Sequence, residues 1–211
     1  QDELLGPLGM VDTQFYLPQD KIPRFAANYS RDASGPIHPI DTPSESRYLV
    51  VPDYKSGNGG LLSTMDDYLS FCRMLRNGGT FEGVKILEPE TVNLMVQNHL
   101  DGDMADMDAA DFGGLDWRGM GFGLGFSVVL DPERVGYGNA GIYGWSGAAS
   151  TYFFVDPQQD LTAVFVTQKF PFDFDMAREF PQAVLEAVAI SDTEVDARGG
   201  ASGGVATEAM P

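Results

Sequence analysis

The chain has 211 residues, of which 43% are apolar and 21% charged, so it has enough apolar side chains for one large packed domain or two small ones. Thirteen basic and 31 acidic residues give a formal net charge of −18, which argues against a nucleic-acid partner because phosphates repel such a surface. No apolar run approaches the roughly 20 residues that cross a bilayer, and the first residues lack the pattern of a secretory signal, so we expect a soluble protein without a membrane span.

The residue counts do not favour disulfide or metal chemistry. Cys72 is the single cysteine, which excludes a disulfide within the chain. With only His38 and His99 beside it, a Cys/His zinc site is not expected. We interpret Cys72 as a core residue, His99 as a helix-end residue bonded to a carbonyl, and His38 as a loop residue.

Loops are expected to dominate residues 7–60, which are dense in proline, glycine, serine and aspartate. Residues 1–5 resemble the end of a helix that Gly6 and Pro7 stop, so we expect the chain to begin within a domain. One short strand-like stretch covers residues 25–29.

The first clear helix is expected after residue 63. Ser63 and Asp66 are spaced as a capping box, in which each side chain bonds the backbone N–H of the other residue. The apolar positions that follow repeat with the period of a helix: Tyr68, Phe71, Cys72 and Leu75. Residues 77–79 (Asn-Gly-Gly) accept the left-handed conformation, so the helix is expected to end there.

A second helix is expected to begin at residues 88–90 (Glu-Pro-Glu), because proline and acidic residues suit the first turn of a helix. Its inner face carries Val92, Met95, Val96 and His99.

Six aspartates follow this helix: Asp101, Asp103, Asp106, Asp108, Asp111 and Asp116. Their spacing does not provide the alternating acids, the central glycine and the final glutamate of an EF-hand loop. We therefore interpret the stretch as a solvated loop and not as a calcium site.

Three strands are expected in quick succession, over residues 123–130, 152–155 and 161–167. Residues 156–160 have the length of a hairpin turn, so the strands form an antiparallel meander. Residues 176–190 indicate a helix that packs on this sheet through Phe180, Val184, Ala187 and Val188. Residues 191–211 lack an apolar period and have the composition of a disordered tail.

The composition of residues 136–151 indicates a possible substrate-binding segment. It is interrupted by five glycines: Gly136, Gly138, Gly141, Gly144 and Gly147. Glycine weakens a strand, so its repeated use suggests that something approaches the backbone closely, such as an acyl substrate laid along the strand edge.

Two interpretations compete for Ser146 within this segment. A nucleophile elbow over residues 144–148 is disfavoured, because strand follows it and because both histidines precede the serine. The alternative is a strand-borne triad, residues 145–147 (Trp-Ser-Gly), at the place where penicillin-binding enzymes carry Lys-Thr-Gly or Lys-Ser-Gly.

An ordered set of motifs accompanies this triad. The motifs are Pro7-Leu8-Gly9-Met10 with Asp12, Thr13 and Phe15; Gly59-Gly60-Leu61 with Ser63, Thr64, Asp67 and Tyr68; Asn77-Gly78-Gly79; Gly144 to Ala149; and Phe154 with Asp156-Pro157. Together they resemble the C-terminal half of the class C β-lactamase-related serine hydrolases, and most closely the family VIII carboxylesterases. The similarity covers roughly residues 5–190.

The resemblance implies an α/β (α+β) fold of the β-lactamase and penicillin-binding-protein type, with an antiparallel sheet flanked by helices and incomplete at the N-terminus. Residues 1–190 would be the C-terminal part of this domain. Such a site combines a Ser-x-x-Lys helix start, a Tyr-x-Asn loop and the strand triad. The first two precede Pro7 in the family, so the nucleophile and base are expected outside this chain. Local matches at residues 137–139 (Tyr-Gly-Asn) and 56–58 (Ser-Gly-Asn) are interpreted as turn residues.

The triad then supplies the remaining roles. By the resemblance, the Ala148 N–H donates to the oxyanion, Gly147 lets the carbonyl approach and the Ser146 hydroxyl contacts substrate. Trp145 replaces the lysine and offers an apolar surface in place of a cation, although a buried core tryptophan is the alternative. The remaining substrate-binding candidates are Tyr143, Gly144 and Ala149. Gly57, Gly59 and Gly60 are expected to border the cleft.

The expected function is hydrolysis of an ester, or of an amide or β-lactam, through an acyl-serine, with uncharged esters preferred. No metal or organic cofactor is implied, and the partners expected are a small ester or amide substrate and the missing N-terminal half of the domain. The alternatives are an acyltransferase on the same fold, a non-catalytic fragment or β-lactamase-like binding protein, and an acidic interaction domain. For the cellular location, both the bacterial cytoplasm and the periplasm agree with the sequence.

Overall fold

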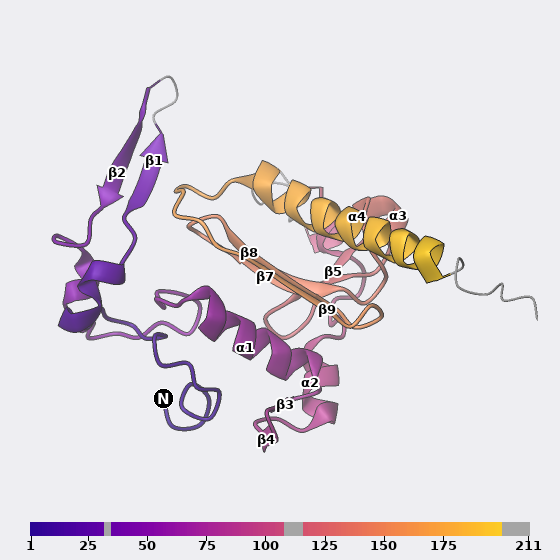
Figure 1. The fold of residues 1–211 in the computed structure, drawn as a ribbon, viewed down its shortest axis with the longest axis horizontal. Coiled ribbons are helices and arrows are strands. Elements are labelled where there is room, and N and C mark those ends of the chain that lie inside the picture. Colours follow the sequence, from indigo (N-terminus) through magenta and orange to yellow (C-terminus); the bar gives the residue numbers. More distant parts are fainter. Residues whose placement is uncertain (32–34, 108–115, 200–211) are drawn as a thin grey trace, which may run out of the picture.

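The computed structural model describes residues 1–31, 35–107 and 116–199 and is built around an antiparallel sheet (Figure 1). The sheet has five strands in the order β5-β6-β7-β8-β9. These are β5 (Met120–Phe122), β6 (Ser127–Val129), β7 (Tyr143–Gly147), β8 (Thr151–Asp156) and β9 (Leu161–Phe165). The sequential order of neighbouring strands confirms an antiparallel meander. The strand expected over residues 123–130 is wrong in its first half, because residues 123–125 form the turn between β5 and β6. Strand β7, which carries the triad, lies between β6 and β8.

Helices cover the two faces of this sheet. Helix α1 (Met65–Arg76) packs on β8 and β9 from one side, and helix α4 (Phe174–Gly199) lies across the other side (Figure 1). The short helices are α2 (Pro89–Met95), α3 (Pro132–Val135) and the 3-10 turns η1 (Gln19–Arg24), η2 (Arg47–Leu49) and η3 (Met104–Met107). The layers match the expected sheet flanked by helices.

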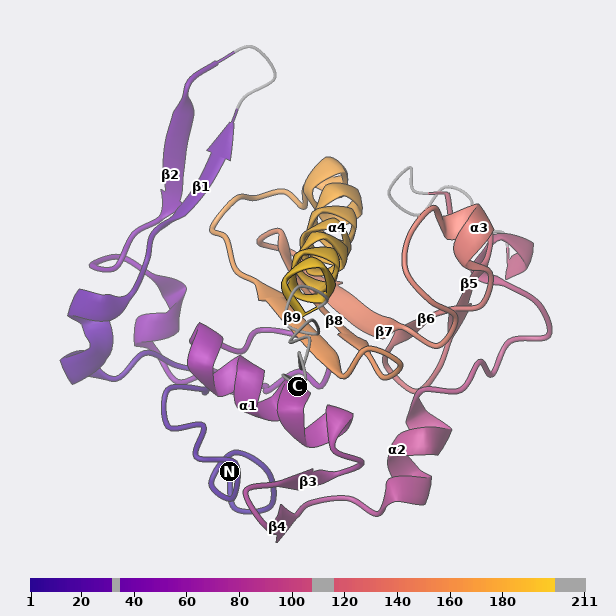
Figure 2. The same ribbon diagram turned by 45° about the vertical axis from the view of Figure 1, so that its right-hand side comes forward.

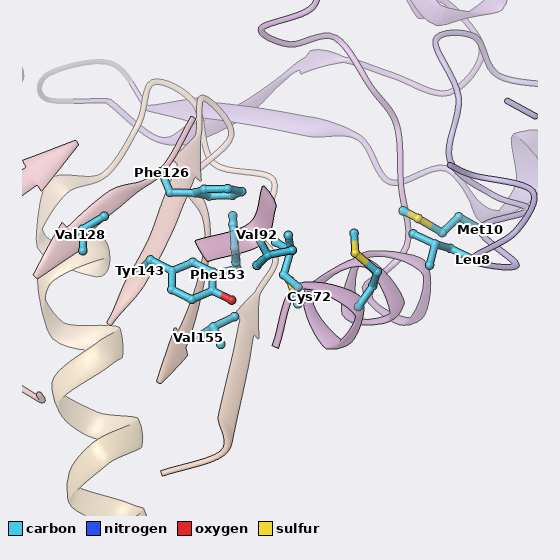
Figure 3. Packing of buried hydrophobic residues seen from close by; sticks show 11 residues of the cluster. Leu8, Met10, Cys72, Val92, Phe126, Val128, Tyr143, Phe153 and Val155 are labelled. Atoms are coloured by element: carbon cyan, nitrogen blue, oxygen red, sulfur yellow. The ribbon is translucent and has the colours of Figure 1, made fainter. Parts of the chain in front are cut away.

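The core is divided between the two faces. On the α1 side, Tyr143, Phe153 and Val155 of the sheet point toward Cys72 of the helix (Figure 3). On the α4 side, Phe180 contacts Tyr152, Phe154 and Phe165, with ring centroids 5.0 to 6.1 Å apart. Alternating residues of β8 therefore serve two cores, as a strand covered on both faces requires.

Helix α1 begins one residue later than expected. Its N-cap is Thr64, whose hydroxyl accepts from the Asp67 N–H at 3.3 Å, so the Ser63 capping box is wrong by one position. The helix ends as expected at Asn77, followed by Gly78 and Gly79 with positive φ angles. A side chain at Gly79 would lie 2.3 Å from the Leu87 carbonyl oxygen, so this turn requires glycine.

The N-terminal segment contains more regular structure than expected. Strands β1 (Asn28–Arg31) and β2 (Ile37–Asp41) form a hairpin that projects away from the sheet (Figure 2), so His38 lies in a strand and not in a loop. Residues 2–9 form successive turns and not the end of a helix. Hydrogen bonds of Tyr29 with Gln168 and Phe170 attach the hairpin to the rest of the molecule.

The remaining differences concern element ends. Strands β3 (Thr80–Phe81) and β4 (Val84–Lys85) pair between α1 and α2. Helix α4 starts at Phe174 and continues past Ile190, so the predicted helix is too short at both ends. Of the expected tail, residues 191–199 lie in α4 and residues 200–211 lie outside the described residues. Among the aspartates, Asp108 and Asp111 also lie outside them. Within the described ranges no helix is long and apolar enough to span a bilayer.

Candidate functional site

Strand β7 is paired on one side only over its second half. Strand β8 pairs with all five residues of β7, whereas β6 pairs only with Tyr143 and Gly144. Residues 145–147 therefore have no strand beside them on the β6 side within the described part of the chain. We call this stretch the open edge.

The open edge exists because β6 begins only at Ser127, which pairs with Gly144. The chain turns at residues 123–125, where the Gly123 N–H donates to the Phe126 carbonyl at 2.8 Å and the Leu124 N–H donates to the Met95 carbonyl at 2.8 Å. A side chain at Gly123 would lie 2.1 Å from the Met95 carbonyl oxygen. Glycine at this turn thus lets the β5–β6 hairpin reverse against the end of α2, which leaves the triad uncovered.

The backbone direction of β7 determines which groups face the open edge. The Gly144 carbonyl accepts from the Ser127 hydroxyl at 3.0 Å, so the peptide groups of Gly144 point toward β6. Because alternate residues of a strand share an edge, the peptide groups of Ser146 point the same way, and Ala148 is the next in that series. Ala148 is exposed and begins the turn that leads into β8.

Packing against β8 requires glycine at Gly144 of β7 and brings a neighbouring side chain close to Gly147. A side chain at Gly144 would lie 2.1 Å from the Phe153 carbonyl oxygen, and one at Gly147 would lie 2.3 Å from the Thr151 hydroxyl oxygen. The neighbouring strand β8, and not a substrate, is therefore what approaches these two positions. Gly136, Gly138 and Gly141 precede β7 and do not interrupt a strand, which corrects the sequence interpretation.

The turn that contains Ala148 is fixed by residues 167–173. Thr167 donates its hydroxyl to the Ala149 carbonyl at 2.6 Å. Ser150, which is buried and has φ +60°, donates to the Lys169 carbonyl and accepts from the Asp173 N–H, both at 2.9 Å. The backbone beyond the triad is thus held by three hydrogen bonds to a segment after β9. Sequence reasoning missed this support, because nothing local in the sequence marks the partners.

The Trp145 side chain is half-buried between the two cores. Its ring lies 6.3 Å from that of Trp117 in a stacked arrangement and 5.1 Å from that of Phe122 in an edge-on arrangement. Tyr143 is buried in the core against Phe126, and burial raises its pKa. The Tyr143 ring therefore lies in the interior, whereas Trp145, Ser146 and Gly147 lie partly exposed along the open edge.

Residues 137–139 and 56–58 match short catalytic motifs in sequence, and both lie in turns, as expected from their order in the chain. The Asn139 amide donates to the Asp156 carboxylate at 2.8 Å, and burial raises the pKa of Tyr137, which shares a hydrogen bond with Tyr152. The Ser56 hydroxyl bonds the Asn58 side chain within one exposed loop.

The glycines expected to border a cleft lie in or next to that exposed loop. Gly57 and Gly59 have open space where a side chain would begin, and Gly60 lies beside the Phe15 ring. These surroundings do not place the three glycines at the open edge.

Cys72 and His99 have structural roles. Cys72 is fully buried, and burial raises the pKa of its thiol to about 12. A ring nitrogen of His99 lies 2.8 Å from the carbonyl oxygen of Leu94, in the last turn of α2. Both interpretations from the sequence are confirmed. Within the described ranges, no three His, Cys, Asp or Glu side chains lie close enough together to hold a metal ion.

Comparisons with known proteins agree with this architecture. The profile of the Beta-lactamase family matches residues 1–187. Protein Rv1367c of Mycobacterium tuberculosis is 38% identical over 175 residues, which cover 81% of this chain and 42% of that protein. The chain thus spans less than half the length of this relative.

Two solved structures have the same fold. EstCE1, described as a hydrolase with promiscuous acyltransferase activity, is 26% identical with a TM-score of 0.65, over 82% of this chain and 45% of that one. The LovD6 mutant of simvastatin synthase from Aspergillus terreus is 24% identical with a TM-score of 0.70, over 92% and 49% of the two chains. The expected β-lactamase and penicillin-binding-protein type of fold is confirmed, and the chain spans about half the length of these structures. The chain belongs to the Beta-lactamase family.

Proposed function

We propose that the complete protein is a serine hydrolase that cleaves uncharged esters through an acyl-serine intermediate. The observation that carries the proposal is the open edge of β7, which leaves Trp145, Ser146 and Gly147 accessible beside a fixed turn. The serine nucleophile, its lysine base and the Tyr-x-Asn loop are assigned to the part of the protein outside this chain. The description of EstCE1 as a hydrolase supports the reaction class.

Each residue of the open edge has a role in this reaction. Attack of the serine on the ester carbonyl places negative charge on the carbonyl oxygen, which needs backbone donors. We assign one donor to the Ala148 N–H, next in the series after Ser146 on that edge. Its position is held through Ala149 and Ser150, whose hydrogen bonds to residues 167–173 preorganise the turn. Expulsion of the alcohol and hydrolysis of the acyl-serine by water complete the reaction.

The charges near the triad favour neutral substrates. Trp145 stands where penicillin-binding enzymes have a lysine, so no cation extends from this position to a substrate carboxylate. Lys169, on the segment that fixes the turn, is paired with Asp173 at 2.7 Å. An anionic β-lactam would therefore lose its ionic partner, whereas a neutral ester requires none.

Two measurements on the complete polypeptide test the proposal. A fluorophosphonate probe should label its nucleophilic serine, and kcat/KM for p-nitrophenyl butyrate should exceed that for benzylpenicillin. Trp145→Lys should move this preference toward penicillin, with Trp145→Phe as the control that keeps an aromatic ring. Absence of labelling would favour a non-catalytic binding protein, and a wild-type preference for penicillin would overturn the assignment of the substrate.

Acyl transfer to an alcohol or amine is the second candidate, favoured by the description of EstCE1 as having promiscuous acyltransferase activity. The acyl-serine is common to both reactions, and only the acceptor differs. Adding increasing concentrations of a short alcohol during ester turnover separates them. A transferase forms the new ester at the expense of free acid, whereas a strict hydrolase yields the acid alone.

A further inference from the structure

The two tryptophans of the chain are stacked on each other beside the open edge. The rings of Trp117 and Trp145 lie 6.3 Å apart with an angle of 22° between their planes. Trp117 is 8% exposed and Trp145 is half-buried, so Trp117 covers one side of the Trp145 ring. Stacked aromatic pairs are stabilising, so this contact restricts the orientation of Trp145.

The turn that carries Trp117 is well fixed. Gly119, with φ +80°, donates its N–H to the Asp103 carboxylate at 2.8 Å, and its carbonyl accepts from the Leu130 and Asp131 N–H groups at 2.8 and 3.1 Å. A side chain at Gly119 would lie 2.9 Å from the Asp131 carbonyl oxygen. The Trp117 ring is therefore presented by a turn that is bonded on both sides.

A second aromatic ring completes the packing around Trp145. Phe122 meets Trp145 edge-on at 5.1 Å, with 77° between the ring planes. The backbone of Phe122 is held in turn, because its N–H donates to the Asn98 side chain and its carbonyl accepts from the His99 N–H, both at 2.9 Å. Trp145 thus contacts one ring across its face and another edge-on, both on fixed backbone.

We propose that Trp117 is a positioning and specificity-determining residue that limits the site to esters with short acyl chains. The inference rests on the proposed function, because it concerns the substrate that lies along the open edge. The ring of Trp117 fills the space beside Trp145 into which a longer acyl chain would extend. It also holds Trp145 in the orientation that forms the wall of the site. We therefore expect acetyl and butyryl esters to be better substrates than an octanoyl ester.

The test measures acyl-chain preference in the complete protein, with p-nitrophenyl acetate, butyrate and octanoate. Trp117→Ala should raise kcat/KM for octanoate relative to acetate about tenfold, mainly through KM, since each methylene accommodated in an apolar pocket changes discrimination by a large factor. Trp117→Phe should keep the wild-type preference within about twofold, because a ring still fills the space. Phe180→Leu is the matched control, since its ring contacts Tyr152, Phe154 and Phe165 in the part of the same core that lies under α4.

Circular dichroism reports whether the stacking itself has been removed. Two indoles in contact whose transition moments are inclined to each other give a paired positive and negative band, which Trp117→Ala and Trp117→Phe should abolish and Phe180→Leu should retain. Where Trp117→Ala does not fold, Trp117→Leu takes its place, because it keeps an apolar side chain while removing the ring.

The outcomes separate the two proposals. If the wild-type protein hydrolyses short esters and Trp117→Ala, with its paired band lost, leaves the acyl-chain preference unchanged, the role of Trp117 is overturned and the hydrolase proposal stands. If Phe180→Leu changes the preference as much as Trp117→Ala, the effect is general destabilisation and the role of Trp117 is again overturned. If the wild-type protein neither hydrolyses esters nor reacts with a fluorophosphonate, the proposed function fails and this inference fails with it.

Discussion

The Asp67 carboxylate binds Thr13 across 54 positions of the chain, accepting from its hydroxyl at 2.8 Å. The same oxygen accepts from the Asp12 N–H at 2.8 Å, and the Thr13 hydroxyl also lies 2.8 Å from that of Ser63. Asp67 and Thr13 are both buried. A single carboxylate at the start of α1 therefore attaches the turns of the N-terminal segment to the helix that supports the sheet.

Removing this carboxylate should destabilise the protein. Asp67→Ala leaves the Thr13 hydroxyl and the Asp12 N–H without their acceptor, and a hydrogen bond to a charged group contributes about 1.5–3 kcal/mol. We expect the free energy of urea unfolding to fall by about that amount. Asp66→Ala, at the exposed neighbouring position, is the control and should change it by no more than about 0.5 kcal/mol. Equal losses in the two variants would contradict the assigned role of Asp67.

Gly144 should tolerate no side chain. The Cβ atom of Gly144→Ala would lie 2.1 Å from the Phe153 carbonyl oxygen, which belongs to the paired backbone of β8 and cannot rotate away. Overpacking of this kind costs about 3 kcal/mol, and separation of the strands would also move the triad. We expect a lower unfolding midpoint together with loss of ester hydrolysis. Gly57→Ala is the matched control, because the space around Gly57 is open; a harmless Gly144→Ala would show that the strands are not packed as described.

The sequence was sufficient to predict the elements whose signals are local. The apolar period of α1, its glycine stop after Asn77 and the β8–β9 hairpin all follow from spacing and turn residues. The N-cap was misplaced because Ser63 and Thr64 are equally suited to capping, and the choice depends on Thr13, which bonds Ser63 from far along the chain. The β1–β2 hairpin was missed for the same reason, since it is attached through Tyr29 to a segment after β9.

The sequence was sufficient to predict which residues form the candidate site, but not how strand pairing and distant turns hold them in place. Residues 145–147 were identified through their resemblance to a known triad, whereas the reason for Gly144 was misjudged because strand pairing is not visible in the sequence. Trp117 was overlooked because it follows a run of aspartates interpreted as a solvated loop. Its contact with Trp145 depends on the turn at Gly119, which is bonded to Asp103.

Stability at low pH should depend on Asp12. Hydrogen bonds from Arg24 and Lys21, at 2.8 and 2.7 Å, lower the pKa of its carboxyl from 3.8 to about 2. A carboxyl with a lowered pKa in the folded state stabilises that state fully above its ordinary pKa, and the contribution is lost as the pH falls toward 2. The urea midpoint should therefore fall between pH 5 and pH 2.

Two variants isolate this contribution. Asp12→Asn lacks the titrating group, so its urea midpoint should fall less over the same pH range than that of the wild type. Asp20→Asn, at an exposed position in the same segment, should reproduce the wild-type curve. Parallel curves for the wild type and Asp12→Asn would contradict the assigned ion pairs.

Because of the exposed apolar residues of its N-terminal segment, the isolated 211-residue chain should bind hydrophobic dyes and self-associate. Ile37, Val50, Val51 and Tyr54 are each more than half exposed, and large apolar side chains left open to water favour association. We expect the chain to bind a hydrophobic dye such as anilinonaphthalene sulfonate and to associate on size-exclusion chromatography. Replacing Val50 and Tyr54 together by serine should reduce the dye fluorescence, whereas Lys55→Ala should not. A monomer that binds no dye and melts in one sharp transition would contradict this expectation. It would indicate that these side chains are stable when exposed to water.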